Sequence, residues 1–256
     1  MNINSSTKLI CLLGQPVKQS FSPSIHNYLS EKYEKNNAYM CFEVERGDLK
    51  SAVEGMKAFK VKGCNVTIPH KVDIIQYLDE VDKNAKLIGA VNTIKNNDGK
   101  LIGYNTDGIG FVKSLLDVCS NLKSKKIMII GAGGACRSIA VELANKNVDS
   151  IELRNRSEAN AKIISDLINT TPIGMNSSQC PIDKNIKPHQ NLIVCDIVYK
   201  PHETELLKWA NNHQLKVVYG INMLINQGLL AYEIWENIKT EEDTEKIKEI
   251  YFKTLK

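Results

Sequence analysis

The sequence predicts an α/β protein with two domains, of which the second is Rossmann-like. Three observations support this prediction. Strand-like and helix-like segments alternate in the first part of the chain, a continuous apolar strand at 127–130 runs directly into a glycine-rich loop, and the alternation then begins again. Such alternation is typical of sheets whose strands are mostly parallel.

The individual elements follow from apolar periodicity. In the first half we expect strands at 9–13, 39–44, 64–67, 91–94 and 100–104, helices after Pro23 and over 53–59, and a further helical pattern at Val72, Ile75 and Leu78. Asp107 suits the start of a helix that joins the domains. In the second half we expect strands at 127–130, 151–153, 166–169, 192–196 and 217–219, a helix over 139–144 and an amphipathic surface helix over 240–256.

The composition is that of an ordinary globular protein, with 43% hydrophobic and 24% charged residues among 256. The basic residues are scattered, which argues against a nucleic-acid partner. The apolar stretch at 9–13 is too short for a signal segment or a membrane span. We therefore expect a cytoplasmic protein without a membrane partner. The absence of heptads or a large apolar surface pattern favours a monomer or a weak homodimer.

The seven cysteines are widely spaced and include no C-x-x-C pair. Most of them suit small buried positions. Because no Cys or His cluster has the spacing of metal ligands, we predict no metal.

The glycine-rich loop is the first candidate binding site. Gly131 permits a tight turn, Gly133 lets a pyrophosphate approach the backbone, and Gly134 begins a helix whose free N–H groups face that phosphate. After the next strand, Asn155-Arg156-Ser157 offers a positive charge and a hydroxyl where an NAD-binding chain carries a carboxylate. This turn favours NADP.

A second candidate site lies in the first half. Asn65, Thr67 and Lys71 follow a strand end, Asn92 lies in a second polar segment, and Asp107 closes a third. Oxidation of an alcohol requires a group that accepts the hydroxyl proton. Lys71 can serve if Asp107 holds it in place.

These residues resemble the shikimate dehydrogenases over nearly the whole chain. The likeness is carried by segments that occur in the same order, namely 20–27, 65–71, Asn92, 105–107, 131–137, 169–175 and 220–228. The resemblance implies reversible reduction of 3-dehydroshikimate to shikimate by NADPH, with Lys71 and Asp107 as the catalytic pair. It implies a substrate site made of Ser20, Ser22, Asn65, Thr67, Asn92, Tyr199 and Gln227. It implies a cofactor site made of Gly131, Ala132, Gly133, Gly134, Ala135, Arg137, Asn155, Arg156, Ser157, Thr171, Gly220 and Met223.

The resemblance also sets the expected domains. Residues 1–108 with 229–256 form a substrate-binding catalytic domain, and residues 109–228 form an NADP-binding Rossmann domain. Two alternatives remain open at this point. One is a quinate/shikimate dehydrogenase that uses NAD, and the other is a non-catalytic dinucleotide-binding protein, for which the glycine loop alone would suffice.

One segment departs from the family. Only eight residues separate Ser157 from the strand expected at 166–169, whereas a parallel crossover usually has about a dozen or more. We expect residues to be missing from the numbering between 161 and 166, with a true deletion as the alternative.

Overall fold

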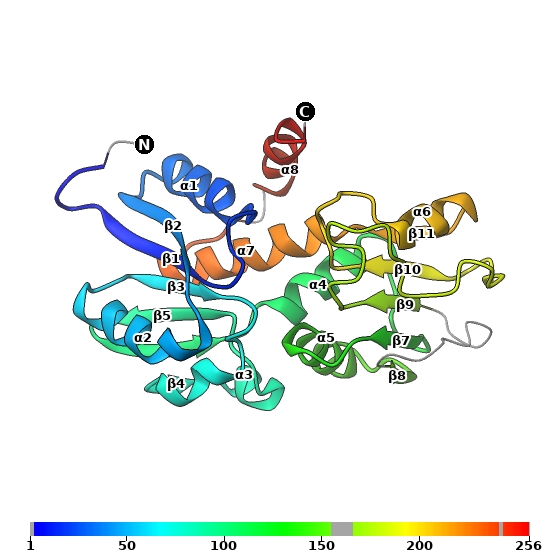
Figure 1. Cartoon of the computed structure of the whole chain (residues 1–256), viewed down its shortest axis with the longest axis horizontal. Helices are drawn as coiled ribbons and strands as arrows, with labels where there is room; N and C mark the ends of the chain where they lie inside the picture. Colours follow the sequence, from blue (N-terminus) through cyan, green and yellow to red (C-terminus); the bar gives the residue numbers. More distant parts are fainter. Residues whose placement is uncertain (1–2, 155–165, 241–242, 256) are drawn as a thin grey trace. The chain divides into compact units, whose positions relative to one another are not determined.

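The computed structural model describes residues 3–154, 166–240 and 243–255. It divides into two compact units, Met1–Thr106 with Gly228–Lys256, and Asp107–Gln227. Each unit is an α/β structure built on one sheet, as the sequence predicts (Figure 1).

The first unit contains a six-stranded sheet in the order β2-β1-β3-β5-β6-β4. β1 pairs in parallel with both β2 and β3, whereas β5 is antiparallel to β3 and to β6. The strands are β1 Lys8–Gly14, β2 Asn37–Glu43, β3 Gly63–Val66, β4 Glu80–Val81, β5 Thr93–Asn97 and β6 Lys100–Tyr104. The helices are α1 Ser22–Lys32, α2 Leu49–Ala58, α3 Lys83–Ile88 and α8 Thr244–Lys253, and short 3-10 helices lie at Arg46–Asp48 and Asp73–Tyr77.

Two local details differ from simple strand and helix alternation. β5 and β6 form a hairpin, because Asp98 and Gly99 both have positive φ (51° and 96°) and make a two-residue turn. The segment expected as a helix around Ile75 is a 3-10 helix. Its apolar spacing of three residues fits the three residues per turn of that conformation.

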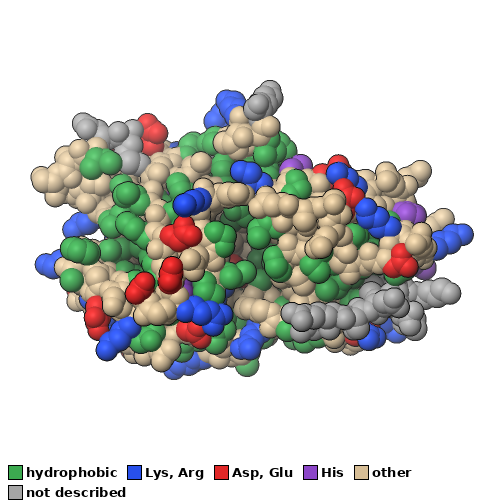
Figure 2. Space-filling view, in the orientation of Figure 1, with side chains coloured by type: hydrophobic (Ala, Val, Ile, Leu, Met, Phe, Trp, Pro, Cys, Tyr) green, Lys and Arg blue, Asp and Glu red, His purple; other side chains and the backbone are tan. Residues whose placement is uncertain are grey.

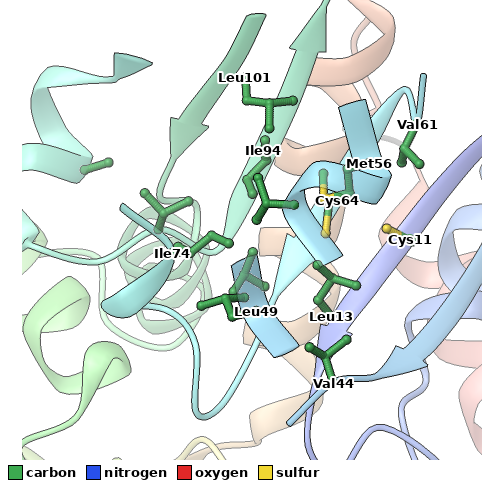
Figure 3. Close-up of a cluster of buried hydrophobic side chains, with 14 residues drawn as sticks. Cys11, Leu13, Val44, Leu49, Met56, Val61, Cys64, Ile74, Ile94 and Leu101 are labelled. Atoms are coloured by element: carbon green, nitrogen blue, oxygen red, sulfur yellow. The ribbon is translucent and has the colours of Figure 1, made fainter. Parts of the chain in front are cut away.

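One face of the first sheet packs on α2 through a cluster of buried apolar side chains (Figure 3). Cys11 and Leu13 of β1 and Cys64 of β3 contribute from the sheet. Elsewhere in this unit, Gly63 lets an aromatic side chain approach, since a Cβ there would lie 2.3 Å from Nε1 of Trp235. The indole N–H of Trp235 donates to the Ile94 carbonyl at 2.9 Å.

The second unit contains a five-stranded sheet in the order β11-β10-β9-β7-β8, with every pair parallel. The strands are β7 Lys126–Ile130, β8 Ser150–Arg154, β9 Asp166–Asn169, β10 Ile193–Asp196 and β11 Lys216–Val218. The helices are α4 Asp107–Leu116, α5 Gly134–Asn145 and α6 Glu205–Asn212, and α7 Gly220–Glu236 continues into the first unit. Asp107 lies in the first turn of α4.

The central strand β7 is buried on both faces. Ile127 and Ile129 pack with α4 and α5, whereas Met128 and Ile130 pack with α6. Alternate side chains of a strand point to opposite faces, so a strand covered on both sides is apolar throughout. Trp209 of α6 belongs to the second cluster, and its indole N–H donates to the Lys184 carbonyl at 3.1 Å.

The prediction that residues are missing after Ser157 is wrong. The chain is continuous, and residues 155–165, which lie outside the described part, connect β8 to β9. β8 and β9 flank β7 and run parallel, so the chain must return from the carboxyl end of β8 to the amino end of β9 across two strand spacings. Eleven residues reach up to about 36 Å when extended, which is enough for a crossover without added length.

Charged side chains of both signs are intermingled on the face shown in Figure 2. None of the described helices is long and apolar enough to cross a membrane. Among the described residues no group of three or more His, Cys, Asp or Glu side chains is placed to hold a metal ion, and all seven cysteines are free thiols.

Asp166, the first residue of β9, is a fully buried carboxylate. Lys125 lies 3.5 Å from its Oδ1. Burial raises the pKa of Asp166 to about 6, and the attraction of Lys125 offsets only part of that effect. The folded state therefore retains a proton here at pH values where the unfolded chain has lost it. The resulting stabilisation is complete below the unfolded pKa and is lost as the pH rises through about 6.

We expect Asp166→Asn to change how stability depends on pH. The amide cannot ionise, so between pH 4.5 and pH 8 the free energy of unfolding should fall by about 2 kcal/mol less than in the unsubstituted protein. Urea unfolding at both pH values measures this difference. Asp149→Asn, which changes an exposed carboxylate, should leave the pH dependence unaltered. Parallel pH curves for Asp166→Asn and the unsubstituted protein would contradict the assignment.

Candidate active site

The first group of predicted site residues lies where β1 and β3 end. The backbone N–H of Thr67 donates to the Leu13 carbonyl at 2.9 Å, and that of Gln15 donates to the Ile68 carbonyl at 2.8 Å. A Cβ on Gly14 would lie 2.2 Å from Cγ2 of Thr67. Glycine at position 14 therefore lets the loops that follow the two strands lie against each other.

Ser20 and Ser22 occupy the loop after β1 and the start of α1. The Ser20 hydroxyl accepts from the Ser22 backbone N–H at 3.2 Å, so the first serine helps to satisfy the helix start. Ser22 is buried and Ser20 half-buried. Two hydroxyls beside the positive end of a helix dipole form a suitable environment for a carboxylate.

Asn92 connects the polar segments of this unit. Its Oδ1 accepts from the Thr106 backbone N–H at 2.8 Å and from the Thr93 hydroxyl at 3.0 Å, while its Nδ2 donates to Oγ1 of Thr106 at 2.9 Å. The side chain is 2% exposed. These bonds hold the residue that directly precedes Asp107.

Asn65 holds Asn92 and the adjacent Thr93 in place through hydrogen bonds. Its Oδ1 accepts from the Tyr39 hydroxyl at 2.8 Å, and its Nδ2 donates to the Asn92 carbonyl and to Oγ1 of Thr93, both at 3.2 Å. Both amide hydrogens of Asn65 are thus bonded to protein atoms. No local pattern in the sequence predicts the contribution of Tyr39, because this tyrosine lies on a different strand.

Lys71 is half-buried and its backbone is fixed at both sides. Its carbonyl accepts from the Val91 N–H at 2.7 Å, and the neighbouring His70 ring bonds the Val44 carbonyl through Nε2 at 2.7 Å. Asp107 is 4% exposed and begins α4. Lys71 belongs to the first unit and Asp107 to the second, so their joint action is part of the proposal below.

The glycine loop lies at the carboxyl end of β7. Gly131 has φ +123°, and a Cβ there would lie 2.3 Å from Oγ1 of Thr170. That hydroxyl donates to the Ile130 carbonyl at 2.7 Å. Gly133 precedes α5 and faces open space, with nothing within 4 Å of an added Cβ. The first glycine is needed by the turn, whereas the second leaves room for a ligand next to the backbone.

The other predicted substrate and cofactor residues of this unit lie at the same strand ends and on the adjoining helices. Thr171 follows β9 and Tyr199 follows β10, while Gly220 and Met223 begin α7. Gln227, on α7, donates through Nε2 to the Leu224 carbonyl at 2.8 Å. Ala132 and Arg137 are exposed and Ala135 is half-buried around the start of α5, and the predicted NADP turn of Asn155, Arg156 and Ser157 lies outside the described residues.

Two family models match the chain in sequence order. The model described as the shikimate dehydrogenase substrate binding domain matches residues 12–94, and that described as shikimate / quinate 5-dehydrogenase matches residues 113–191. The chain belongs to the shikimate dehydrogenase family. The resemblance inferred from the sequence motifs is thereby confirmed.

Individual members of the shikimate dehydrogenase family match more than nine-tenths of the chain. The protein named shikimate dehydrogenase (NADP(+)) of Methanocaldococcus jannaschii is 44% identical, with 93% of this chain and 94% of the relative covered. The crystal structure of shikimate dehydrogenase from Aquifex aeolicus is 37% identical and has a TM-score of 0.90, with 95% and 97% covered. The Thermus thermophilus enzyme, solved in complex with NADP(H) and shikimate, is 28% identical with a TM-score of 0.86, with 94% and 98% covered.

The comparison with the Methanocaldococcus relative also bears on chain length. The alignment extends over 267 residues although it covers only 93% of this 256-residue chain. The relative therefore carries residues within the aligned region that this chain lacks. This chain is thus shorter than that relative within the aligned region.

We expect Tyr39→Phe to destabilise the first unit by about 1–2 kcal/mol, because Oδ1 of buried Asn65 loses its donor. Urea unfolding measures the loss. Tyr232→Phe is the matched control. Tyr232 is also buried, but its hydroxyl makes a longer hydrogen bond, 3.4 Å to Oγ of Ser30. Equal losses in the two variants would show that the hydroxyl of Tyr39 has no special role.

Proposed function

We propose that this protein is an NADP-dependent shikimate dehydrogenase that reversibly reduces 3-dehydroshikimate to shikimate in the shikimate pathway of aromatic amino acid biosynthesis. The observation that carries the proposal is 44% identity over 93% of the chain to a protein named for that activity. The polar residues that the activity requires are present at the strand ends described above.

The first unit is proposed to bind the substrate. Ser20 and Ser22 suit its carboxylate, because hydroxyls beside a helix start donate to an anion. Thr67 and Asn92 suit the ring hydroxyls. Asn65 acts in this site through Asn92, since its own amide hydrogens are already bonded. Tyr199 and Gln227, from the second unit, are proposed to complete the site.

Lys71 is proposed to move the proton. In the direction of reduction, its ammonium group donates a proton to the substrate carbonyl oxygen while the carbonyl carbon accepts a hydride, and the amine then regains a proton from water. Asp107 is proposed to orient the ammonium group. NADPH, when bound, supplies the hydride.

The second unit fits a dinucleotide. Gly133 leaves the backbone open to a pyrophosphate, and α5 begins at the next residue with its free N–H groups. Thr171, Gly220 and Met223 are proposed to lie near the nicotinamide. The choice of NADP over NAD is supported by the names of the relatives and by the basic residue Arg156.

The alternatives make different predictions in one assay. A quinate/shikimate dehydrogenase would oxidise quinate or work with NAD, and a non-catalytic dinucleotide-binding protein would be inactive with both substrates. The monomeric or weakly dimeric state and the cytoplasmic location remain predictions from the sequence.

We expect absorbance of the reduced cofactor to rise when shikimate and NADP are supplied, and to rise more slowly with quinate or NAD. Lys71→Ala should lower kcat by about 10²-fold or more with little change in shikimate binding, because the proton donor is lost. Lys86→Ala, on the exposed side of α3, should behave as the unsubstituted protein. Silence with every combination would refute the enzyme assignment, and an unchanged rate in Lys71→Ala would remove Lys71 from the mechanism.

The two glycines of the cofactor loop should differ when replaced. Gly133→Ala should leave the free energy of unfolding unchanged, since the new Cβ meets no atom, yet it should raise the Kd for NADPH about tenfold or more by crowding the pyrophosphate. Gly131→Ala should lower stability itself, because of its positive φ and the close Thr170 hydroxyl. Thermal unfolding and fluorescence titration with NADPH distinguish the two effects. Unchanged NADPH affinity in Gly133→Ala would contradict the placement of the pyrophosphate.

A further inference from the structure

Asp196 ends β10 with a carboxylate that is 2% exposed. Its Oδ1 accepts from Nδ2 of Asn169 and from the Val198 backbone N–H, both at 3.0 Å. Its Oδ2 accepts from the Thr204 hydroxyl at 2.7 Å. One side chain therefore joins the end of β9, the segment after β10 and the start of α6.

The bond to Asn169 continues into the loop after β9. Oδ1 of Asn169 accepts from the backbone N–H of Thr171 at 3.0 Å and from its hydroxyl at 2.7 Å, and Nδ2 of Asn169 also reaches the Ile173 carbonyl at 3.2 Å. Because the amide oxygen is used by Thr171, its nitrogen must point toward an acceptor. Asp196 supplies that acceptor and so fixes the orientation of the amide.

The loop held in this way lies against the glycine turn. Besides the Thr170 hydroxyl, Cγ2 of Thr171 would be 3.3 Å from a Cβ on Gly131. The backbone N–H of Thr170 also donates to the Ile130 carbonyl at 2.9 Å. The position of Thr171 relative to the cofactor loop is thus set by Asn169, and the position of Asn169 by Asp196.

The second arm of the carboxylate reaches the segment before Tyr199. The bond to the Val198 N–H shapes the turn after β10, and the carbonyl of Ile197 in that turn would lie 2.5 Å from a Cβ on Gly220. The start of α7, which carries Met223, therefore packs directly on the backbone that Asp196 organises.

A buried carboxylate is unfavourable for the fold alone. Desolvation raises the pKa of Asp196 to about 6 in spite of its three hydrogen bonds. Apolar packing at this position would avoid that penalty. The placement of the carboxylate between loops at the cofactor edge provides a reason for its presence.

We infer that Asp196 is a positioning residue for hydride transfer, and that it holds the loops of Thr171 and Val198 in the arrangement that the nicotinamide of the dinucleotide requires. The inference rests on the proposed function. It concerns the second unit, and because Tyr199 follows the turn that Asp196 holds, we expect a large effect on the cofactor and a smaller one on shikimate.

Asp196→Ala tests the inference against Asp166→Ala, which removes a comparably buried carboxylate from the opposite end of the same sheet. Asp196→Ala should raise the KM for NADPH and lower kcat, together reducing kcat/KM by about ten- to a hundredfold through misplacement of the loops. The KM for shikimate should rise by less than the KM for NADPH. Asp166→Ala should change the thermal midpoint and leave these kinetic parameters as they are.

Two more variants keep the test decisive if Asp196→Ala does not fold. Asp196→Asn retains an oxygen that can accept from Asn169 and Val198 and should restore the KM for NADPH, whereas Asn169→Ala breaks the same arm and should reproduce its rise. A normal KM for NADPH and a normal kcat in Asp196→Ala and Asn169→Ala would overturn the inference, as would equal kinetic losses in Asp166→Ala. If the unsubstituted protein is inactive with shikimate and NADP, the proposed function itself fails.

Discussion

Parallel pairing of strands is the constraint on which both candidate sites depend. β1 with β3, and β7 with β9 and β10, run in the same direction. The carboxyl ends of these strands therefore meet at one edge of each sheet. The loops that follow bring together residues that are far apart in the sequence, and hydrogen bonds between neighbouring loops then fix their positions.

Each edge is stabilised by a buried polar side chain with several partners. In the first unit the side chain of Asn92 accepts hydrogen bonds from Thr106 and Thr93, and Nδ2 of Asn65 donates to the Asn92 carbonyl. In the second unit Asp196 is the buried polar side chain that accepts several hydrogen bonds, from Asn169, Val198 and Thr204. Loss of one partner would leave a buried polar atom without a hydrogen bond, which is energetically costly. Such networks therefore have one favourable arrangement. This property suits a site that must hold a bound ligand in one orientation.

The sequence was sufficient for the features that depend on local pattern. The run from Ile127 to Ile130 followed by glycines predicts a buried strand and its loop, because every residue of such a strand is apolar. The order of the motifs led to the correct family. Asp98-Gly99 is a typical turn pair, but the sequence analysis predicts strands at 91–94 and 100–104 only as separate short segments, whereas the structure pairs them as the β5–β6 hairpin.

The supporting contacts could not be predicted, because they join residues from separate strands. Nothing local in the sequence indicates that Tyr39 bonds Asn65 or that Asp196 bonds Asn169. Asp196 is a charged residue at the end of the apolar strand β10, and this position is the one local feature that could have marked it as a candidate site residue. The expected gap after Ser157 was wrong because a typical crossover length was applied to a chain that can join the two strands with fewer residues.

The two tryptophans provide a natural means of observing the units separately. Trp235 lies in the first unit and Trp209 in the second, each is 4% exposed, and each indole N–H bonds a carbonyl of its own unit. Replacing either one by phenylalanine leaves a single tryptophan, in a known unit, whose emission can be excited apart from that of the tyrosines. The emission of such a protein reports the unfolding of one unit at a time, so that cooperativity between the units becomes a measurable quantity without an added label.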